Sequence, residues 1–150
     1  MRGLKYCIIN EKNMRIHSVI TVYMLVFSTF FNLNKLECLI LILTIALVLI
    51  SEIINTSTEA ILDKIAFEYN SSAKIIKDIA AGAVLLSAAA AVVVGVIIFN
   101  DFEIYLSIFN FFKNSIFLSL VFMASLVFNW YYIFWGPKEI LNKIKSRRKI

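Results

Sequence analysis

The sequence predicts an all-α integral membrane protein, and three features of its composition indicate this fold class. Apolar residues make up 61% of the 150 residues and charged residues only 17%, whereas a soluble domain has about half and a quarter. A chain of this size cannot bury so many apolar side chains in one globular core. Glycine and proline are few, at four and one, which argues against a structure rich in turns. Lipid is therefore the expected surrounding.

The first half of the chain is expected to contain two spans. Residues 1–16 mix basic and apolar side chains, which is typical of an amphipathic helix at the membrane interface. Residues 16–33 are apolar and close to the shortest length that crosses a bilayer. After a tight loop at residues 34–37, a second span begins at Cys38 and runs through a polar stretch to Leu62.

The second half predicts two further spans. Residues 63–78 form a polar connection, and residues 79–99 form a third span with small residues at every fourth position, which permits close helix packing. Residues 100–115 are expected to be an amphipathic connector, and residues 115–135 a fourth span that ends in a belt of tryptophan and tyrosine. Pro137 is predicted to stop this helix.

The distribution of basic residues predicts the orientation. Thirteen of the fifteen Lys and Arg residues lie in the N-terminal segment, in the connection at 63–78 or in the tail after Gly136. Basic residues favour the cytoplasmic side, so four spans would leave both termini in the cytoplasm. Because these residues lie at segment ends and not in a stripe with interleaved aromatics, we expect no nucleic-acid partner.

Three polar residues at membrane depth are the strongest indication of chemistry. Glu52, Asn55 and Glu59 are spaced by three and then four residues, so they share one helical face, which Asp63 continues. Glu52 would lie about 10 Å deeper than Glu59. Such a face could hold Mg²⁺ near the surface and accept a proton further in. Alternatively, Glu59 and Asp63 are ordinary interfacial charges, or Glu52 translocates a proton or ion.

Other kinds of site find little support. The sequence lacks a GxxxxGK phosphate loop, and its glycines are too scattered for a glycine-rich lid. His17 has no partner pattern for zinc or for a nucleophile triad. Cys7 and Cys38 are too few and too far apart in sequence to indicate a disulfide framework or a zinc site.

Three segments together resemble one family. The run Glu52-Ile-Ile-Asn55-Thr-Ser-Thr-Glu59 resembles the ExxNTAIE signature of the prokaryotic diacylglycerol kinase family, which includes the undecaprenol kinases. Residues 73–86 resemble its AKDxAAGAVLL segment, and residues 3–15 resemble its GxxxxxxxNExNxR segment. The three segments occur in the family's order and at similar intervals, so the match is far more specific than one short motif.

The resemblance implies an architecture and an activity. It covers residues 1–99 as a diacylglycerol-kinase-like membrane domain, with an N-terminal amphipathic segment and a core of three transmembrane helices. Residues 100–150 would add the connector, a fourth C-terminal transmembrane helix and a basic cytoplasmic tail. The family resemblance implies a homotrimer in the bacterial cell membrane that transfers the γ-phosphoryl group of ATP to a lipid hydroxyl.

The resemblance also implies roles for individual residues. Glu52 would be the general base, and Glu11 and Glu59 would hold Mg²⁺ beneath the phosphates of the nucleotide. Asn55 and Arg15 would contact substrate. The further residues implied to lie near the nucleotide are Glu68, Tyr69, Asn70, Lys77 and Asp78.

The sequence also favours one acceptor lipid over another. The sequence AAGAVLL and the abundance of Ile, Lys and Asn resemble the undecaprenol kinases and favour undecaprenol as the acceptor lipid. Diacylglycerol is the alternative acceptor. A non-enzymatic membrane protein, such as a holin-like pore former or a transporter subunit, would explain the short spans and the basic tail. It would not explain Glu52 with Asn55, or the Lys77–Asp78 pair.

Overall fold

The structure is a computed structural model that describes residues 2–65 and 71–147, with side chains of the last helix described as far as Pro137. Every regular element in this part of the chain is an α-helix, so the predicted all-α class is confirmed. The helices form two compact units. The hairpin unit is Leu33–Asn100, and the terminal unit combines Met1–Asn32 with Asp101–Ile150.

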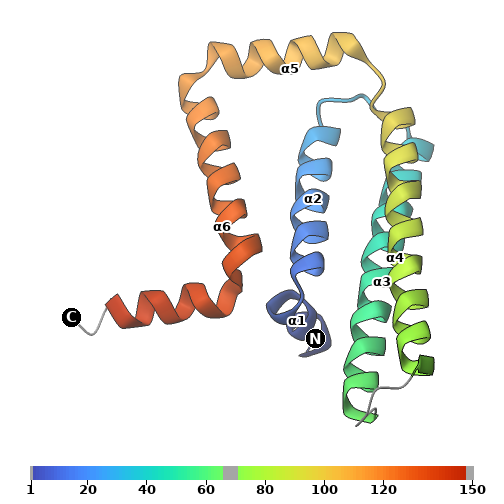
Figure 1. Ribbon diagram of the computed structural model, residues 1–150. Helices are drawn as coiled ribbons and strands as arrows, with labels where there is room; N and C mark the ends of the chain where they lie inside the picture. Colours follow the sequence, from blue (N-terminus) through green and yellow to red (C-terminus); the bar gives the residue numbers. More distant parts are fainter. Residues whose placement is uncertain (1, 66–70, 148–150) are drawn as a thin grey trace. The chain divides into compact units, whose positions relative to one another are not determined.

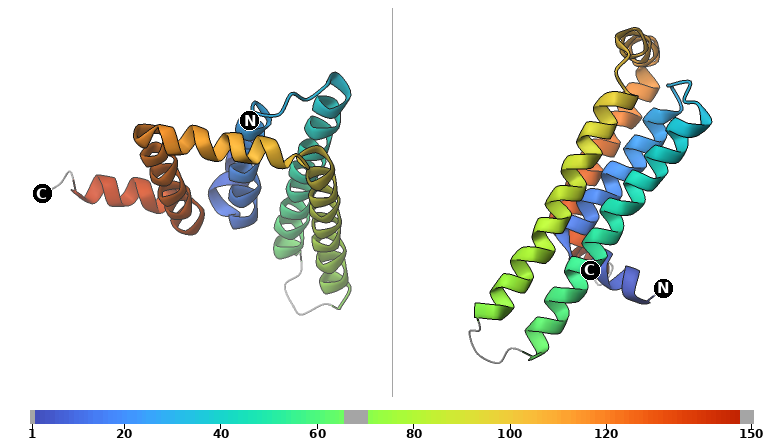
Figure 2. Two further views of the ribbon diagram at one scale, coloured as in Figure 1. Left: turned by 90° about the horizontal axis from the view of Figure 1, so that it is seen from above. Right: turned by 90° about the vertical axis from the view of Figure 1, so that its right-hand side faces the viewer.

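The hairpin unit consists of two long helices, α3 (Lys35–Ile65) and α4 (Ser71–Ile98), which lie side by side in Figures 1 and 2. At about 1.5 Å per residue they are roughly 46 Å and 42 Å long, more than the ~30 Å of a bilayer core. Each contains a stretch long and apolar enough to cross a membrane. Their exposed side chains are mostly large and apolar, which suits lipid rather than water.

Both helices extend beyond the predicted spans. The predicted loop at 34–37 is wrong in its last three residues, because Asn34 caps α3. The Asn34 Oδ1 atom accepts bonds from the N–H groups of Leu36 (2.9 Å) and Glu37 (3.0 Å), and Glu37 Oε2 accepts from Asn34 N–H (2.8 Å). The predicted polar connection at 63–78 is likewise helical over 63–65 and 71–78.

The terminal unit contains α1 (Arg2–Asn10), α2 (Lys12–Ser28), α5 (Phe102–Asn114) and α6 (Ile116–Arg147). Helix α2 has 17 residues, about 26 Å, and ends earlier than the span predicted at 16–33. The three candidate spans among the described residues are α3, α4 and residues 116–137 of α6. The count of four spans therefore stays a prediction.

Helix α6 changes direction at Gly136, as Figure 1 shows. The backbone there has φ 67° and ψ 165°, a left-handed conformation that glycine adopts without strain. Pro137 follows as the first residue of a second helical stretch, a position where its missing N–H costs nothing. The prediction that Pro137 stops the helix is correct for the first stretch, but the basic tail is itself helical to Arg147.

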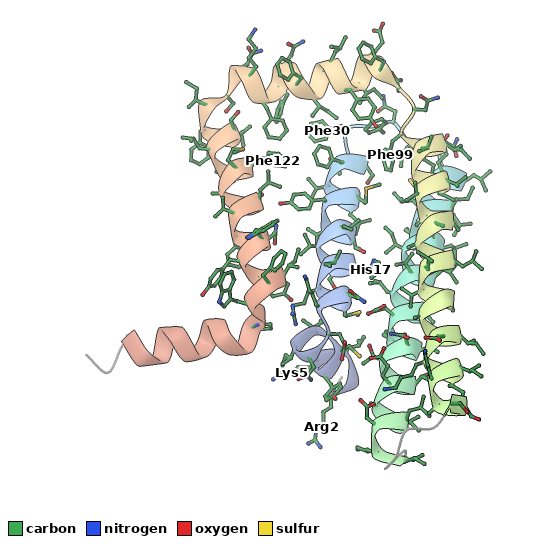
Figure 3. All side chains as sticks on the ribbon, viewed as in Figure 1. Arg2, Lys5, His17, Phe30, Phe99 and Phe122 are labelled. Atoms are coloured by element: carbon green, nitrogen blue, oxygen red, sulfur yellow. The ribbon has the colours of Figure 1, made fainter. Side chains whose placement is uncertain are left out.

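Helices α2 and α6 pack antiparallel within the terminal unit, since residues with higher numbers in α2 contact residues with lower numbers in α6. The contacts join Lys12 to Phe134, Arg15 to Ile133, Tyr23 to Ser125 and Phe27 to Phe122. Aromatic rings fill the end where these helices meet α5, near Phe30 and Phe122 in Figure 3. Edge-to-face pairs such as Phe30–Phe111, with centroids 5.6 Å apart, hold this end together.

Candidate functional site

The buried face of α3 changes from apolar to polar part-way along the helix. Leu41 and Val48 are buried on it, and so are Glu52, Asn55 and Thr56, one and two turns further on. These positions are seven, four, three and one residues apart, so they form one stripe on a helix with 3.6 residues per turn. The predicted clustering of Glu52 and Asn55 on one buried face is therefore present in the structure.

Glu52 is 1% exposed. A carboxylate is rarely buried to this degree unless it is paired or has a function. Its neighbour along the stripe, Asn55, is 7% exposed and donates through Nδ2 to Glu59 Oε1 over 3.2 Å. The hydrogen bond fixes the amide so that its nitrogen faces Glu59 and its Oδ1 atom points to the other side.

Buried oxygen atoms of Asn55 and Thr56 on this stripe lack a hydrogen-bond partner within the described part of the chain. They are Asn55 Oδ1 and Thr56 Oγ1, and Thr56 is 3% exposed. Buried polar atoms are nearly always bonded, so an unbonded pair marks a place for a ligand, a donor group or a cation. Sequence reasoning missed Thr56, although its position four residues after Glu52 places it on the same face.

Lys77 and Asp63 join the two helices near the predicted cytoplasmic end of the hairpin unit. Lys77 Nζ lies 2.5 Å from Asp63 Oδ1, and the two side chains are 40% and 67% exposed. An ion pair this exposed to solvent contributes little to stability, so an incoming phosphate can displace Asp63. Asp78, the next residue on α4, is exposed. Glu68, Tyr69 and Asn70, also predicted to lie near the nucleotide, fall outside the described residues.

Two predicted site residues belong to the terminal unit. Glu11 has an extended backbone (φ −99°, ψ 121°) and separates α1 from α2 as the N-cap residue of α2. Arg15, one turn later, is only 7% exposed. Its guanidinium donates to three backbone carbonyls, those of Ile8, Ile9 and Ile133. Its predicted contact with substrate stays a prediction.

The donor set suits magnesium in its chemistry. Carboxylate and amide oxygens are the ligands that Mg²⁺ prefers, and Glu59 and Asn55 supply one of each kind on the same face of α3. Within the described residues, no three side chains of the types His, Cys, Asp or Glu gather into a complete metal site. Mg²⁺ commonly takes only one or two protein carboxylates and completes its shell with water and phosphate oxygens, so this arrangement fits.

Comparison with known proteins identifies the family. The profile of the prokaryotic diacylglycerol kinases matches residues 1–99, which include α1, α2, α3 and α4. The chain belongs to the prokaryotic diacylglycerol kinase family. The resemblance carried by the three sequence segments is thereby confirmed, and with the candidate spans it makes this a bacterial membrane protein from a family of lipid kinases.

Curated relatives of the family carry two names. A diacylglycerol kinase of Synechocystis sp. is 40% identical over 94 residues, which are 62% of this chain and 54% of the relative. A diacylglycerol kinase of Escherichia coli is 32% identical over 92 residues, 61% of this chain and 75% of the relative. An undecaprenol kinase of Bacillus subtilis is 31% identical over 98 residues, 65% of this chain and 80% of the relative. The match thus spans about half the length of the cyanobacterial relative.

Proposed function

We propose that the protein is an ATP-dependent lipid kinase that transfers the γ-phosphoryl group of ATP to the hydroxyl of a membrane lipid. The observation that carries this proposal is the burial of Glu52 on α3, in line with Asn55 and Glu59. A holin-like protein or a transporter subunit would not require this arrangement. Membership of a lipid-kinase family supports the enzyme as well.

In this mechanism Glu52 is the general base. It takes the proton of the lipid hydroxyl while the oxygen forms a bond to the γ-phosphorus of ATP. The bond from that phosphorus to the β–γ bridging oxygen breaks, and ADP leaves with the electron pair. The burial of Glu52 supports this role, because bulk water does not compete with the lipid hydroxyl for a carboxylate that is shielded from solvent.

The remaining residues hold and neutralise the nucleotide. Glu11 and Glu59 would bind Mg²⁺, with Asn55 beside them, and the ion would spread the negative charge of the phosphates. Lys77, once released from Asp63, would contact a phosphate oxygen. The other residues assigned to the nucleotide are Glu68, Tyr69, Asn70 and Asp78. We expect the active enzyme to be a homotrimer with both termini in the cytoplasm.

Undecaprenol is the proposed acceptor, and diacylglycerol is the second candidate. The proposal of undecaprenol rests on the AAGAVLL sequence in α4 and on the amino-acid composition of the chain. The second is favoured by the higher identity, 40%, to a relative named diacylglycerol kinase. Lipid tails differ in apolar packing alone, which discriminates weakly, so the two acceptors have to be compared directly.

The test is a phosphorylation assay with purified protein, ATP, Mg²⁺ and either lipid alcohol. Glu52→Gln keeps the size of the side chain and removes the base, so we expect turnover to fall by about 10²- to 10⁴-fold. Glu103→Gln, an exposed change in the first turn of α5, is the matched control and should keep native turnover. Near-native turnover of Glu52→Gln would remove Glu52 from the base role. Labelling of neither lipid by the native chain would refute the kinase itself.

A further inference from the structure

Two helix breaks in the terminal unit leave backbone carbonyls without helical donors. Helix α1 ends at Asn10, and the extended backbone of Glu11 turns the next N–H groups away from the carbonyls of Ile8 and Ile9. In α6, Pro137 has no N–H, so the carbonyl four residues earlier, that of Ile133, loses the donor that a continuous helix would supply. These two breaks lie more than a hundred residues apart in sequence.

The side chain of Arg15 donates to all three of these carbonyls. Its Nε bonds the oxygen of Ile133 at 3.1 Å, and one terminal nitrogen bonds those of Ile9 at 3.2 Å and Ile8 at 3.4 Å. A guanidinium suits this task, because its five N–H donors point in fixed directions within one plane. No single ammonium or amide has that spread of donors.

Gly136 makes room for this contact. A Cβ atom added there would lie 3.3 Å from both Cζ and a terminal nitrogen of Arg15, and the φ of +67° strains any residue with a side chain. Lys12 of α2 contacts Phe134, the residue of α6 that follows Ile133. The Lys12 Nζ atom lies 4.0 Å from the centre of the Phe134 ring, within the range of a cation–π interaction. Residues on both sides of Glu11 are therefore fixed by α6 or by Arg15.

We propose that the Arg15–Ile133 contact is a latch by which the C-terminal helix positions Glu11. Arg15 is then a positioning residue that ties the last turn of α1 and the first turn of α2 to α6, so that the backbone between them keeps one conformation. This inference rests on the proposed function, because it takes Glu11 as a magnesium ligand. It assigns a role to α6, which lies beyond the residues matched by the family.

The first test does not depend on activity. Cys7 lies in the last turn before the break and is 4% exposed, and its carbonyl accepts from Glu11 N–H at 2.8 Å. In a Cys38→Ser background, which removes the exposed thiol, Cys7 is labelled with a maleimide in lipid nanodiscs. Arg15→Gln and Gly136→Ala should each label severalfold faster than the native chain. Gly3→Ala is the matched control, because nothing lies within 4 Å of its added Cβ.

The second test measures the magnesium dependence of lipid phosphorylation. Loss of a positioning residue typically weakens metal affinity about 10- to 100-fold, so the apparent KM for Mg²⁺ should rise by that factor in Arg15→Gln and Gly136→Ala. Turnover of Gly136→Ala at saturating Mg²⁺ should stay close to native, which separates positioning from a general loss of structure.

Either measurement can refute the proposal that the Arg15–Ile133 contact positions Glu11. Native rates of Cys7 labelling in both variants would show that Arg15 does not hold the break. Faster labelling with an unchanged KM for Mg²⁺ would show that the break does not position a metal ligand. If the native chain phosphorylates neither lipid, the metal role of Glu11 is refuted with the proposed function. The labelling comparison still decides separately whether Arg15 joins α6 to α1.

Discussion

The buried hydroxyl of Thr56 offers a test that separates stability from function. Its Oγ1 atom is buried on α3 without a hydrogen-bond partner in the described part of the chain, and the residue is 3% exposed. Valine has almost the same shape and replaces the hydroxyl with a methyl group. Thr56→Val therefore removes one polar atom and little else.

The size of the effect follows from the burial. A buried hydroxyl without a partner costs about 1–3 kcal/mol relative to one in water. Removing it should stabilise the protein by about 1–2 kcal/mol, with roughly 2–4 °C in Tm for each kcal/mol in a chain of this size. If the hydroxyl bonds substrate during turnover, its loss should lower kcat/KM about tenfold, the value of one hydrogen bond near 1.4 kcal/mol.

Thermal unfolding is measured in detergent, and lipid phosphorylation is measured on the same protein preparations. Thr44→Val is the matched control on the same helix, because the Thr44 hydroxyl donates to the carbonyl of Ile40 at 2.8 Å. Its replacement removes a satisfied hydrogen bond, so the Tm should stay at or below that of the native chain. A Tm of Thr56→Val below that of Thr44→Val would refute the reasoning. A gain in Tm with native kcat/KM would show that the hydroxyl has no role in turnover.

Two further predictions concern the nucleotide and the topology. Asp63→Asn removes the carboxylate that competes with phosphate for Lys77, so steady-state kinetics should show a KM for ATP lower by up to about fivefold. A rise in that KM would mean that Lys77 does not meet the phosphates. A reporter fused after Ile150 should score on the cytoplasmic side, and a score on the opposite side would contradict an even number of crossings.

The sequence predicts the apolar central parts of α3 and α4 correctly, but it does not predict where these helices begin and end. Apolar runs identify the centres of α3 and α4, because lipid selects for continuous hydrophobicity. Their ends lie in charged segments, where hydropathy gives no signal and local hydrogen bonds decide. The Asn34–Glu37 capping box is an example, since it starts α3 within a stretch that resembles a loop.

The candidate site was predictable where it depends on a single helix. The spacing of Glu52, Asn55 and Glu59 determines that they share a face, whatever the rest of the chain does. The partners of Arg15 could not be predicted in this way. Pro137 predicts that the carbonyl of Ile133 lacks a donor, but only the packing of α6 on α2 shows which side chain takes its place.

The packing of the terminal unit bears on how the family domain folds in this protein. Residues 1–99 match the family, yet α1 and α2 form one compact unit with residues 101–150. The face of α2 that carries Arg15, Tyr23 and Phe27 contacts α6, with the Tyr23 hydroxyl 3.0 Å from Ser125 Oγ and 2.9 Å from Asn129 Nδ2. Without α6 the Tyr23 hydroxyl would lose both of these hydrogen-bond partners, and the Arg15 guanidinium would lose the carbonyl of Ile133. In this chain, the segment beyond the family match therefore completes the surroundings of a helix within it.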